Sequence, residues 1–458
     1  MELSKSRKNI IYLGCCLLTA TIMLSAMGLN NTMFAILAQM NGLQHYSLMA
    51  VLSGFGTSIM CLVGSNLGQM YGRRIMSLIG ASVALVCMIA MGLTDNLMVF
   101  IVARALLSFG IGTFTALPYA ICATIFTREE YTGKVGILGS IMALTTFLGS
   151  TISGAMVDRG MVALSIIYPG ICALTGALII FIFLPKEPPA PSRIDIKGVL
   201  CVSAMLATFS YSFTFASSLG FGHWSIIAGF IITIVAAVML YKVEEKEAQP
   251  LVPFRLFRNG KFTGLCIIGM LVSIYQLVMG VYVPVTGQAI MGLTAAMTGL
   301  FSLPRTILSI VLPLVLAAWA NKKAGNMRIG LIITGLCCTL PFAAFAFTNE
   351  NTMVWIPFAL LAITGVAEGF KGVCSSPLVV RQLQPQDIGI GIGLSSACGS
   401  LGATFATPVL GAIYNAKVNT DMNGALSIVY WMTAGFGLLA TLIAVFALKD
   451  KKEASVKQ

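Results

Sequence analysis

Charged residues are scarce in this chain, and their scarcity excludes most soluble proteins. Only 10% of the 458 residues are Asp, Glu, Lys or Arg, whereas 57% are hydrophobic. A soluble domain carries roughly 25% charged residues, because its surface faces water. A chain of this length that is apolar throughout is expected to have the lipid bilayer as its solvent.

Histidine is nearly absent, and no pattern typical of a metal site is present. His45 and His223 are the only two histidines, and they lie far apart in the sequence. The 12 cysteines all fall inside apolar runs and lack metal-ligand or paired-loop spacing. We therefore expect packing roles for the cysteines, no metal, no cofactor and no enzymatic activity, since no nucleophile–base set is visible.

Long polar segments are also missing, so the sequence has no room for a soluble output domain. The net charge of +12 is compatible with nucleic-acid binding in principle. The basic residues, however, sit in short turns between apolar runs rather than in one cluster. We expect the bilayer, and no nucleic acid, as the partner of this charge.

What the sequence does contain is fourteen apolar runs, each with the roughly 17–25 residues that a bilayer-spanning helix needs. They predict an all-α polytopic membrane protein. The first run follows Lys5, Arg7 and Lys8 and is too long for a signal peptide, so we interpret it as a retained helix. The predicted spans are 10–36, 46–68, 75–93, 97–120, 134–156, 162–184, 198–218, 222–241, 262–286, 294–319, 328–347, 352–377, 388–413 and 426–448.

The basic residues predict the orientation of these spans. Most of the 28 Lys and Arg residues lie in the termini and in alternate turns on one side, whereas the opposite side has only Arg159 and Lys417. Cytoplasmic loops carry the excess of Lys and Arg in membrane proteins. Both termini are therefore expected to be cytoplasmic, in agreement with an even number of spans.

A polar turn after the second span carries a motif. The turn is Ser65-Asn66-Leu67-Gly68-Gln69-Met70-Tyr71-Gly72-Arg73-Arg74, and a weaker basic turn containing Asn321 follows span 10. The first turn resembles the loop between helices 2 and 3 of the major facilitator superfamily, G-x-L-a-D-x-x-G-R-R/K. Gln69 stands where that family usually has aspartate. The resemblance implies a gating loop formed by Gly68, Gln69, Gly72, Arg73, Arg74 and Asn321.

Further motifs are similar to the fourteen-helix drug:proton antiporter branch of that superfamily. They are Arg104 to Gly110, Gly149-Ser150-Thr151-Ile152-Ser153-Gly154 and Gln249 to Asn259. The resemblance implies two pseudo-symmetric six-helix bundles, at 1–190 and 246–458, with two added helices at 191–245. The small residues Gly149, Ser150 and Gly154 are typical of a moving helix interface, although tight packing alone also explains them.

Glu368 is the only one of the 16 acidic residues that lies well inside a predicted span. Intramembrane acids are costly and mark proton relays, so Glu368 is the candidate proton carrier, with Arg104 assisting as the resemblance implies. Two structural alternatives remain open. Lys371, one turn away, can neutralise Glu368, or it can extend towards the interface and leave Glu368 free.

The remaining candidates would line a substrate cavity: Asn30, Tyr275, Gln276, Arg305 and Lys371. Asn30 replaces an acid that the family often has in helix 1, and an amide cannot carry a proton. Arg104, Arg305 and Lys371 outnumber the single acid, which favours an anionic or neutral substrate over a cationic drug. Arg104 as a purely structural arginine, and Tyr275 as a packing residue, stay open alternatives.

The combined prediction is a monomeric transporter in a bacterial-type cell membrane. It moves a small amphipathic organic molecule by alternating access, as proton-coupled efflux. The alternative is a facilitator, or a proton symporter that takes up a metabolite. Neither the substrate nor the direction of transport follows from the sequence.

Overall fold

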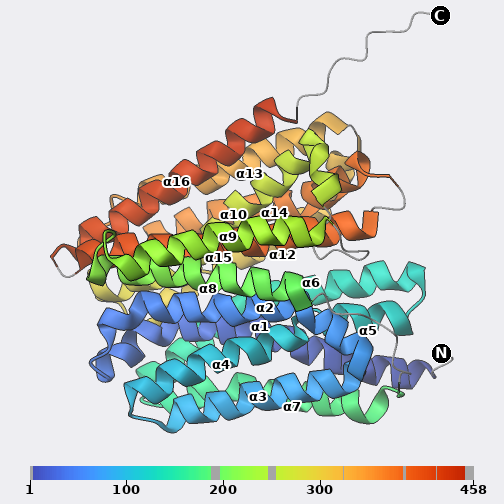
Figure 1. The fold of residues 1–458 in the computed structure, drawn as a ribbon, viewed down its shortest axis with the longest axis horizontal. Helices are drawn as coiled ribbons and strands as arrows, with labels where there is room; N and C mark the ends of the chain where they lie inside the picture. Colours follow the sequence, from blue (N-terminus) through green and yellow to red (C-terminus); the bar gives the residue numbers. More distant parts are fainter. Residues whose placement is uncertain are drawn as a thin grey trace, which may run out of the picture. The chain divides into compact units, whose positions relative to one another are not determined.

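The structure is a computed structural model that describes residues 4–186, 196–245, 254–322, 324–384, 388–418 and 420–448. The regular structure of these residues is helical throughout (Figure 1). The helices are α1 (Lys5–Gln39), η1 (Leu43–His45), α2 (Tyr46–Tyr71), α3 (Arg73–Leu93), α4 (Leu97–Thr115), α5 (Leu117–Ile125), α6 (Arg128–Asp158), α7 (Val162–Phe183), α8 (Ile196–Leu219), α9 (Trp224–Glu244), η2 (Phe254–Arg258), α10 (Gly260–Val285), η3 (Thr286–Ile290), α11 (Ala295–Leu300), α12 (Leu303–Lys322), α13 (Ala324–Phe345), α14 (Trp355–Gln382), α15 (Ile388–Val418) and α16 (Met422–Phe446).

The expected all-α polytopic architecture is confirmed. Thirteen helical stretches among the described residues are long and apolar enough to cross a bilayer. The helix α2 covers the remaining predicted span, 46–68. The orientation of the termini stays a prediction.

Two predicted spans differ from the observed helices. The span predicted at 294–319 is two helices, α11 and α12, and Pro304 is the second residue of α12. The stretch that begins at Leu97 is also two helices, α4 and α5, with Pro118 in the first turn of α5. Proline has no backbone N–H and is accommodated most easily in the first turn of a helix, where that N–H has no partner within the helix. Apolar composition does not reveal these interruptions, because both helices of each pair are apolar.

The residues form two compact units. Unit 1 comprises 1–251, 280–303 and 407–425, and unit 2 comprises 252–279, 304–406 and 426–458. The division predicted from sequence at 190 and 245 falls in or beside segments outside the described residues, and it stays a prediction.

In unit 1, α1 packs against α6 and α7, α3 packs against α4 and α7, and α2 packs against α4. Small residues allow this close packing. A Cβ added at Gly14 in α1 would lie 2.8 Å from the carbonyl oxygen of Gly176 in α7, and a Cβ at Gly176 would lie 2.9 Å from that of Gly14. Close backbone approach of this kind is how helices associate in lipid, where there is little hydrophobic driving force between them.

The helices α8 and α9 pack against each other, and α9 has an exposed apolar face. Ile227, Ile231, Val235 and Val238 recur at helical spacing on α9 and are all exposed. So large an apolar surface is rare on a soluble monomer. Within a bilayer it contacts acyl chains, which is the physical reason that this chain is a membrane protein.

In unit 2, close contacts position the polar cluster described below. A Cβ added at Gly365 in α14 would lie 2.7 Å from the carbonyl oxygen and 2.8 Å from the Cα of Arg305 in α12. The glycine therefore lets the backbones of α12 and α14 touch at Arg305. Glu368 follows Gly365 by three residues and shares its helix face, because residues i and i+3 lie on one side of a helix.

Candidate functional site

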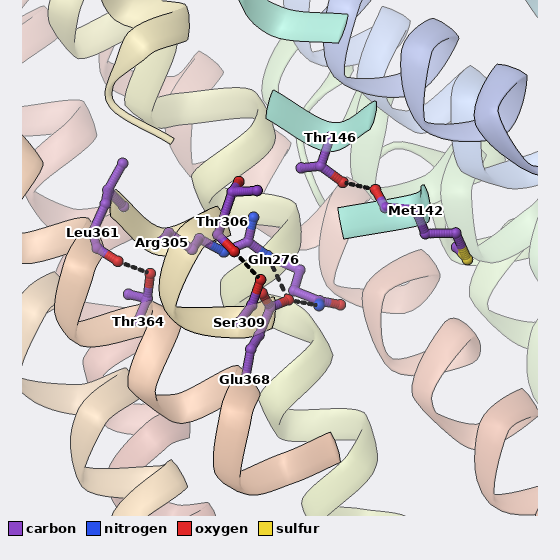
Figure 2. Close-up of polar contacts among 9 residues, drawn as sticks. All are labelled: Met142, Thr146, Gln276, Arg305, Thr306, Ser309, Leu361, Thr364 and Glu368. Atoms are coloured by element: carbon purple, nitrogen blue, oxygen red, sulfur yellow. Dashed lines mark hydrogen bonds and ion pairs between the residues drawn. The ribbon is translucent and has the colours of Figure 1, made fainter. Parts of the chain in front are cut away.

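Two side chains from two helices of unit 2 converge on a carboxylate oxygen of Glu368, which lies on a third helix (Figure 2). The Nη2 atom of Arg305, from α12, lies 2.5 Å from Oε1 of Glu368, from α14. The side-chain amide of Gln276, from α10, donates to the same Oε1 at 2.6 Å. Three of the residues predicted from sequence therefore form one ion-pair network.

The second carboxylate oxygen of Glu368 is left open. Among the described residues, no donor reaches Oε2, and this atom is not one of the buried polar atoms that lack a partner. The side chain of Glu368 is 18% exposed, against 6% for Arg305. The carboxylate is thus held at Oε1 while Oε2 stays accessible to water, a substrate or a proton.

Tyr275 and Lys371 lie near this network without completing it. The hydroxyl of Tyr275 is buried and interacts electrostatically with Arg305 and Glu368, but it makes no hydrogen bond of standard geometry with a described residue. Lys371 forms no ion pair within 4 Å of Glu368 in the part of the chain described here. The partner of Glu368 is therefore Arg305, from another helix, and the alternative of a local Glu368–Lys371 pair is not the arrangement observed.

Arg104 and Asn30 meet inside unit 1. Arg104, on α4, is only 3% exposed. Its Nη2 donates to the side-chain oxygen of Asn30, on α1, at 3.4 Å. No carboxylate lies within 4 Å of Arg104 among the residues described, so it has no acidic proton-transfer partner there.

A second polar cluster of unit 1 centres on Asn31. Its amide nitrogen donates to the carbonyl oxygens of Ser150 on α6, at 3.0 Å, and of Ala295 on α11, at 2.7 Å. Its amide oxygen accepts from Thr298 at 3.0 Å, and its backbone oxygen accepts from Gln288 at 2.7 Å. We call this set, with Asp158, the Asn31 seam. It joins α1, α6 and the segment from η3 to α11.

Asp158 extends the Asn31 seam at the last residue of α6. Its two carboxylate oxygens accept from the backbone N–H groups of Ala295, at 3.1 Å, and Ala296, at 2.8 Å, in the first turn of α11. These N–H groups have no partner within their own helix, and a negative charge beside them is favourable. Gly154 makes the approach possible, since a Cβ there would lie 2.5 Å from the oxygen of Ala295.

The predicted small-residue motif in α6 lies on close helix contacts. A Cβ at Gly149 would lie 2.9 Å from the Cα of Leu24 on α1. The hydroxyl of Ser150 lies 3.3 Å from the carbonyl oxygen of Gly299 on α11. The motif is therefore part of the surface that α6 presents to α1 and α11.

The predicted gating loop includes one turn that requires glycine. Gly72 joins α2 to α3 with a φ of 91°, a conformation that other residues rarely adopt. Arg73 donates to the carbonyl oxygen of Ala120 and to the hydroxyl of Thr124, both at 2.9 Å, at the end of α5. A cation at a helix C-terminus is favourable.

The rest of that loop is described in part. The Arg74 guanidinium carbon lies 4.6 Å from the ring centroid of Phe181 on α7. A Cβ at Gly68 would lie 2.7 Å from the Leu117 side chain of α5. The side chains of Gln69 and Asn321 lie outside the described part of the chain.

Sequence reasoning missed Asn31 and Asp158. Asn31 stands next to Asn30, and successive helical residues point about 100° apart, so one amide contacts Arg104 and the other contacts α6 and α11. Two adjacent amides in an apolar run were a usable signal. Asp158 lies just beyond the predicted span 134–156, and nothing local in the sequence reveals that α11 begins beside it.

Comparison with known proteins identifies a family. A sequence model described as Major Facilitator Superfamily matches residues 15–407 and 327–458. The chain is 22% identical over 428 residues to the Multidrug transporter protein MdtP of Bacillus subtilis, covering 91% of this chain and 78% of that protein. It is 21% identical over 380 residues to the Methylenomycin A resistance protein of Streptomyces coelicolor, covering 81% and 78%.

A solved structure shares the fold. The crystal structure of an auto inhibited POT family peptide transporter matches with a TM-score of 0.68 at 13% sequence identity. The match covers 99% of this chain and 98% of that one. At this identity the likeness concerns the fold alone.

Proposed function

This chain belongs to the Major Facilitator Superfamily, and from that membership we propose a proton-coupled transporter of an amphipathic organic molecule, anionic or neutral. The proposed direction is efflux across the cytoplasmic membrane. The similarity to a multidrug transporter and to a methylenomycin A resistance protein supports export. The charge of Arg104 in unit 1, which has no carboxylate within 4 Å among the described residues, supports an anionic or neutral substrate.

The observation that carries the proposal is the Arg305–Glu368 pair. A charged pair among apolar helices is costly to desolvate, so it is retained for function by default. The unprotonated carboxylate can accept a hydrogen bond from the substrate at Oε2, and protonation of Glu368 removes that acceptor. A proton and the substrate thereby compete for one side chain, and such competition is what the exchange of protons for substrate requires.

Alternating access needs contacts that form in one state and break in the other. The Asn31 seam fits this requirement in unit 1, because its hydrogen bonds join helices through side chains and short helix ends rather than through a packed apolar core. Asn31 and Asp158 lie in the C-terminal parts of α1 and α6, away from the basic N-terminus. With both termini cytoplasmic, the seam closes the outer side.

Flux measurements test coupling. The purified chain is reconstituted in vesicles, and transport of naphthalenesulfonate is followed with and without an imposed pH gradient. A coupled transporter accumulates the probe against its concentration gradient only when the pH gradient is present. Equal, purely downhill flux in both conditions favours the alternative, a facilitator, and contradicts the coupling proposed here.

A further inference from the structure

Arg104 is a buried cation with no carboxylate within 4 Å among the described residues. It is 3% exposed, and its one hydrogen bond within the described chain is the long contact of 3.4 Å to Asn30. Tyr46, a neutral phenol, is the only titratable group there that interacts with it electrostatically. An arginine in this setting has its charge almost uncompensated.

The depth of Arg104 makes this arrangement expensive. Arg104 is seven residues from the start of α4, and Asn30 is nine residues from the end of α1. At about 1.5 Å per residue, they lie roughly 10 and 14 Å from the helix ends, inside a hydrocarbon core about 30 Å thick. Charges at such depth are rare, and they line substrate or ion pathways.

The guanidinium of Arg104 also has N–H donors that no described residue accepts from. Its Nε is buried and has no acceptor among the described residues. Its Nη1 has no acceptor there either, but unlike Nε it is not sealed from solvent. A planar group with free donors matches the geometry of carboxylates and sulfonates. Asn30 is half-buried and adds an amide N–H donor beside it.

We propose that Arg104 and Asn30 bind the anionic group of the substrate, a carboxylate or sulfonate, and that Asn30 sets the charge selectivity. This inference rests on the proposed function as a transporter of an organic molecule. Asparagine and aspartate have nearly the same shape, but an aspartate at 30 would pair with Arg104. The asparagine leaves the positive charge of Arg104 available to the substrate.

The test compares three probes that share a naphthalene ring: naphthalenesulfonate, naphthalenesulfonamide and naphthylmethyl-trimethylammonium. Affinities are measured on the purified full chain by intrinsic fluorescence or calorimetry. The variants are Asn30→Asp, which neutralises the site by adding a charge, and Arg104→Gln, which removes one. Asn351→Asp adds the same charge at an exposed loop position and serves as the control.

The unaltered chain is expected to bind the sulfonate more tightly than the sulfonamide. Asn30→Asp and Arg104→Gln should each weaken sulfonate binding roughly 10- to 100-fold, the range for losing a hydrogen bond to a charged group. Sulfonamide affinity should change little, and Asn351→Asp should leave all three affinities unchanged. If one variant does not fold, the other still tests the proposal, because Asn30→Asp adds a negative charge beside Arg104 whereas Arg104→Gln removes the positive charge itself.

Three results overturn the inference: no sulfonate preference in the unaltered chain, unchanged sulfonate affinity in a folded variant, or equal loss for all three probes. The proposed function fails separately. Loss of selectivity in Asn30→Asp with no pH-driven accumulation in the unaltered chain supports this site and contradicts the coupling. If the unaltered chain accumulates the probe when a pH gradient is imposed, and Asn30→Asp leaves the preference for the sulfonate unchanged, the result contradicts the Arg104–Asn30 site but not the proposed coupling.

Discussion

Replacing Glu368 with glutamine tests the proposed coupling most directly. The substitution keeps the size of the side chain and an oxygen at the position of Oε1, so Arg305 and Gln276 retain a hydrogen-bond acceptor. It removes the negative charge and the capacity to carry a proton. The variant therefore imitates the protonated state permanently.

The expected loss of stability can be estimated from the contacts. Removing one partner of a buried ion pair costs about 3–5 kcal/mol, because the other charge stays buried. A hydrogen bond from a charged donor is worth about 1.5–3 kcal/mol, and glutamine keeps much of it. We expect Glu368→Gln to lower the free energy of unfolding by roughly 2 kcal/mol, well short of the full cost of a broken pair.

Two assays follow the variant. Thermal unfolding of the purified chain measures stability, with Glu350→Gln, the same change at an exposed acid, as the control. Flux in vesicles measures coupling: Glu368→Gln should exchange naphthalenesulfonate across the membrane but should not accumulate it when a pH gradient is imposed. The double variant Arg305→Gln/Glu368→Gln should be at least as stable as Glu368→Gln, since no unpaired charge remains.

Uphill accumulation by Glu368→Gln would refute the reasoning, because no other acid contacts this network among the described residues. A double variant whose stability loss equals the sum of the two single losses would show that the pair has no coupling energy. In that case Arg305 and Glu368 would be neighbours rather than partners.

The remaining predictions concern helix contacts. Asp158→Asn should weaken the hydrogen bonds to the first turn of α11 by about 1–2 kcal/mol, which changes the ratio of seam-closed to seam-open molecules roughly 5- to 30-fold. Cysteines placed in the helices that the Asn31 seam joins should then be labelled faster, whereas Asp95→Asn, the same change at an exposed acid, should not alter the labelling. Gly154→Val should force α11 away from α6 and raise that labelling, whereas Gly139→Val, which meets no atom within 4 Å, should leave it unchanged. Arg328→Gln should lower the unfolding free energy by roughly 1–3 kcal/mol, because Arg328 donates to the carbonyl oxygens of Ala444 and Val445 at the end of α16; a thermal midpoint equal to that of the unaltered chain would contradict this.

Much of the fold could be predicted because bilayer-spanning helices are encoded locally. A run of about 20 apolar residues is long enough to span, whatever surrounds it. Breaks such as that between α11 and α12 escaped prediction, because two consecutive apolar helices have the composition of one long helix. A proline in an apolar run can lie at the start of a helix or inside one, as Pro304 and Pro313 of α12 do, so the sequence alone does not identify a helix start.

The sequence predicted which residues belong to the candidate site, but it did not predict which of them contact one another. Glu368 and Arg305 stood out in the sequence because charges are costly in a membrane. Lys371, one turn from Glu368, was the nearest candidate partner by spacing, yet the observed partner of Glu368 is Arg305 on another helix. Spacing along a chain measures distance only within one helix, so it cannot rank contacts between helices.

The sequence alone therefore determined that this protein lies in a membrane, which of its stretches are long and apolar enough to cross it, and which rare polar residues are functional candidates. These properties follow from composition and from the cost of burying charge. The tertiary structure alone decided that Glu368 pairs with Arg305, that Asn30 and Asn31 serve different clusters, and that Asp158 caps α11. Each of these contacts joins residues distant in the sequence, and only the packing of helices through glycines such as Gly154 and Gly365 brings them together.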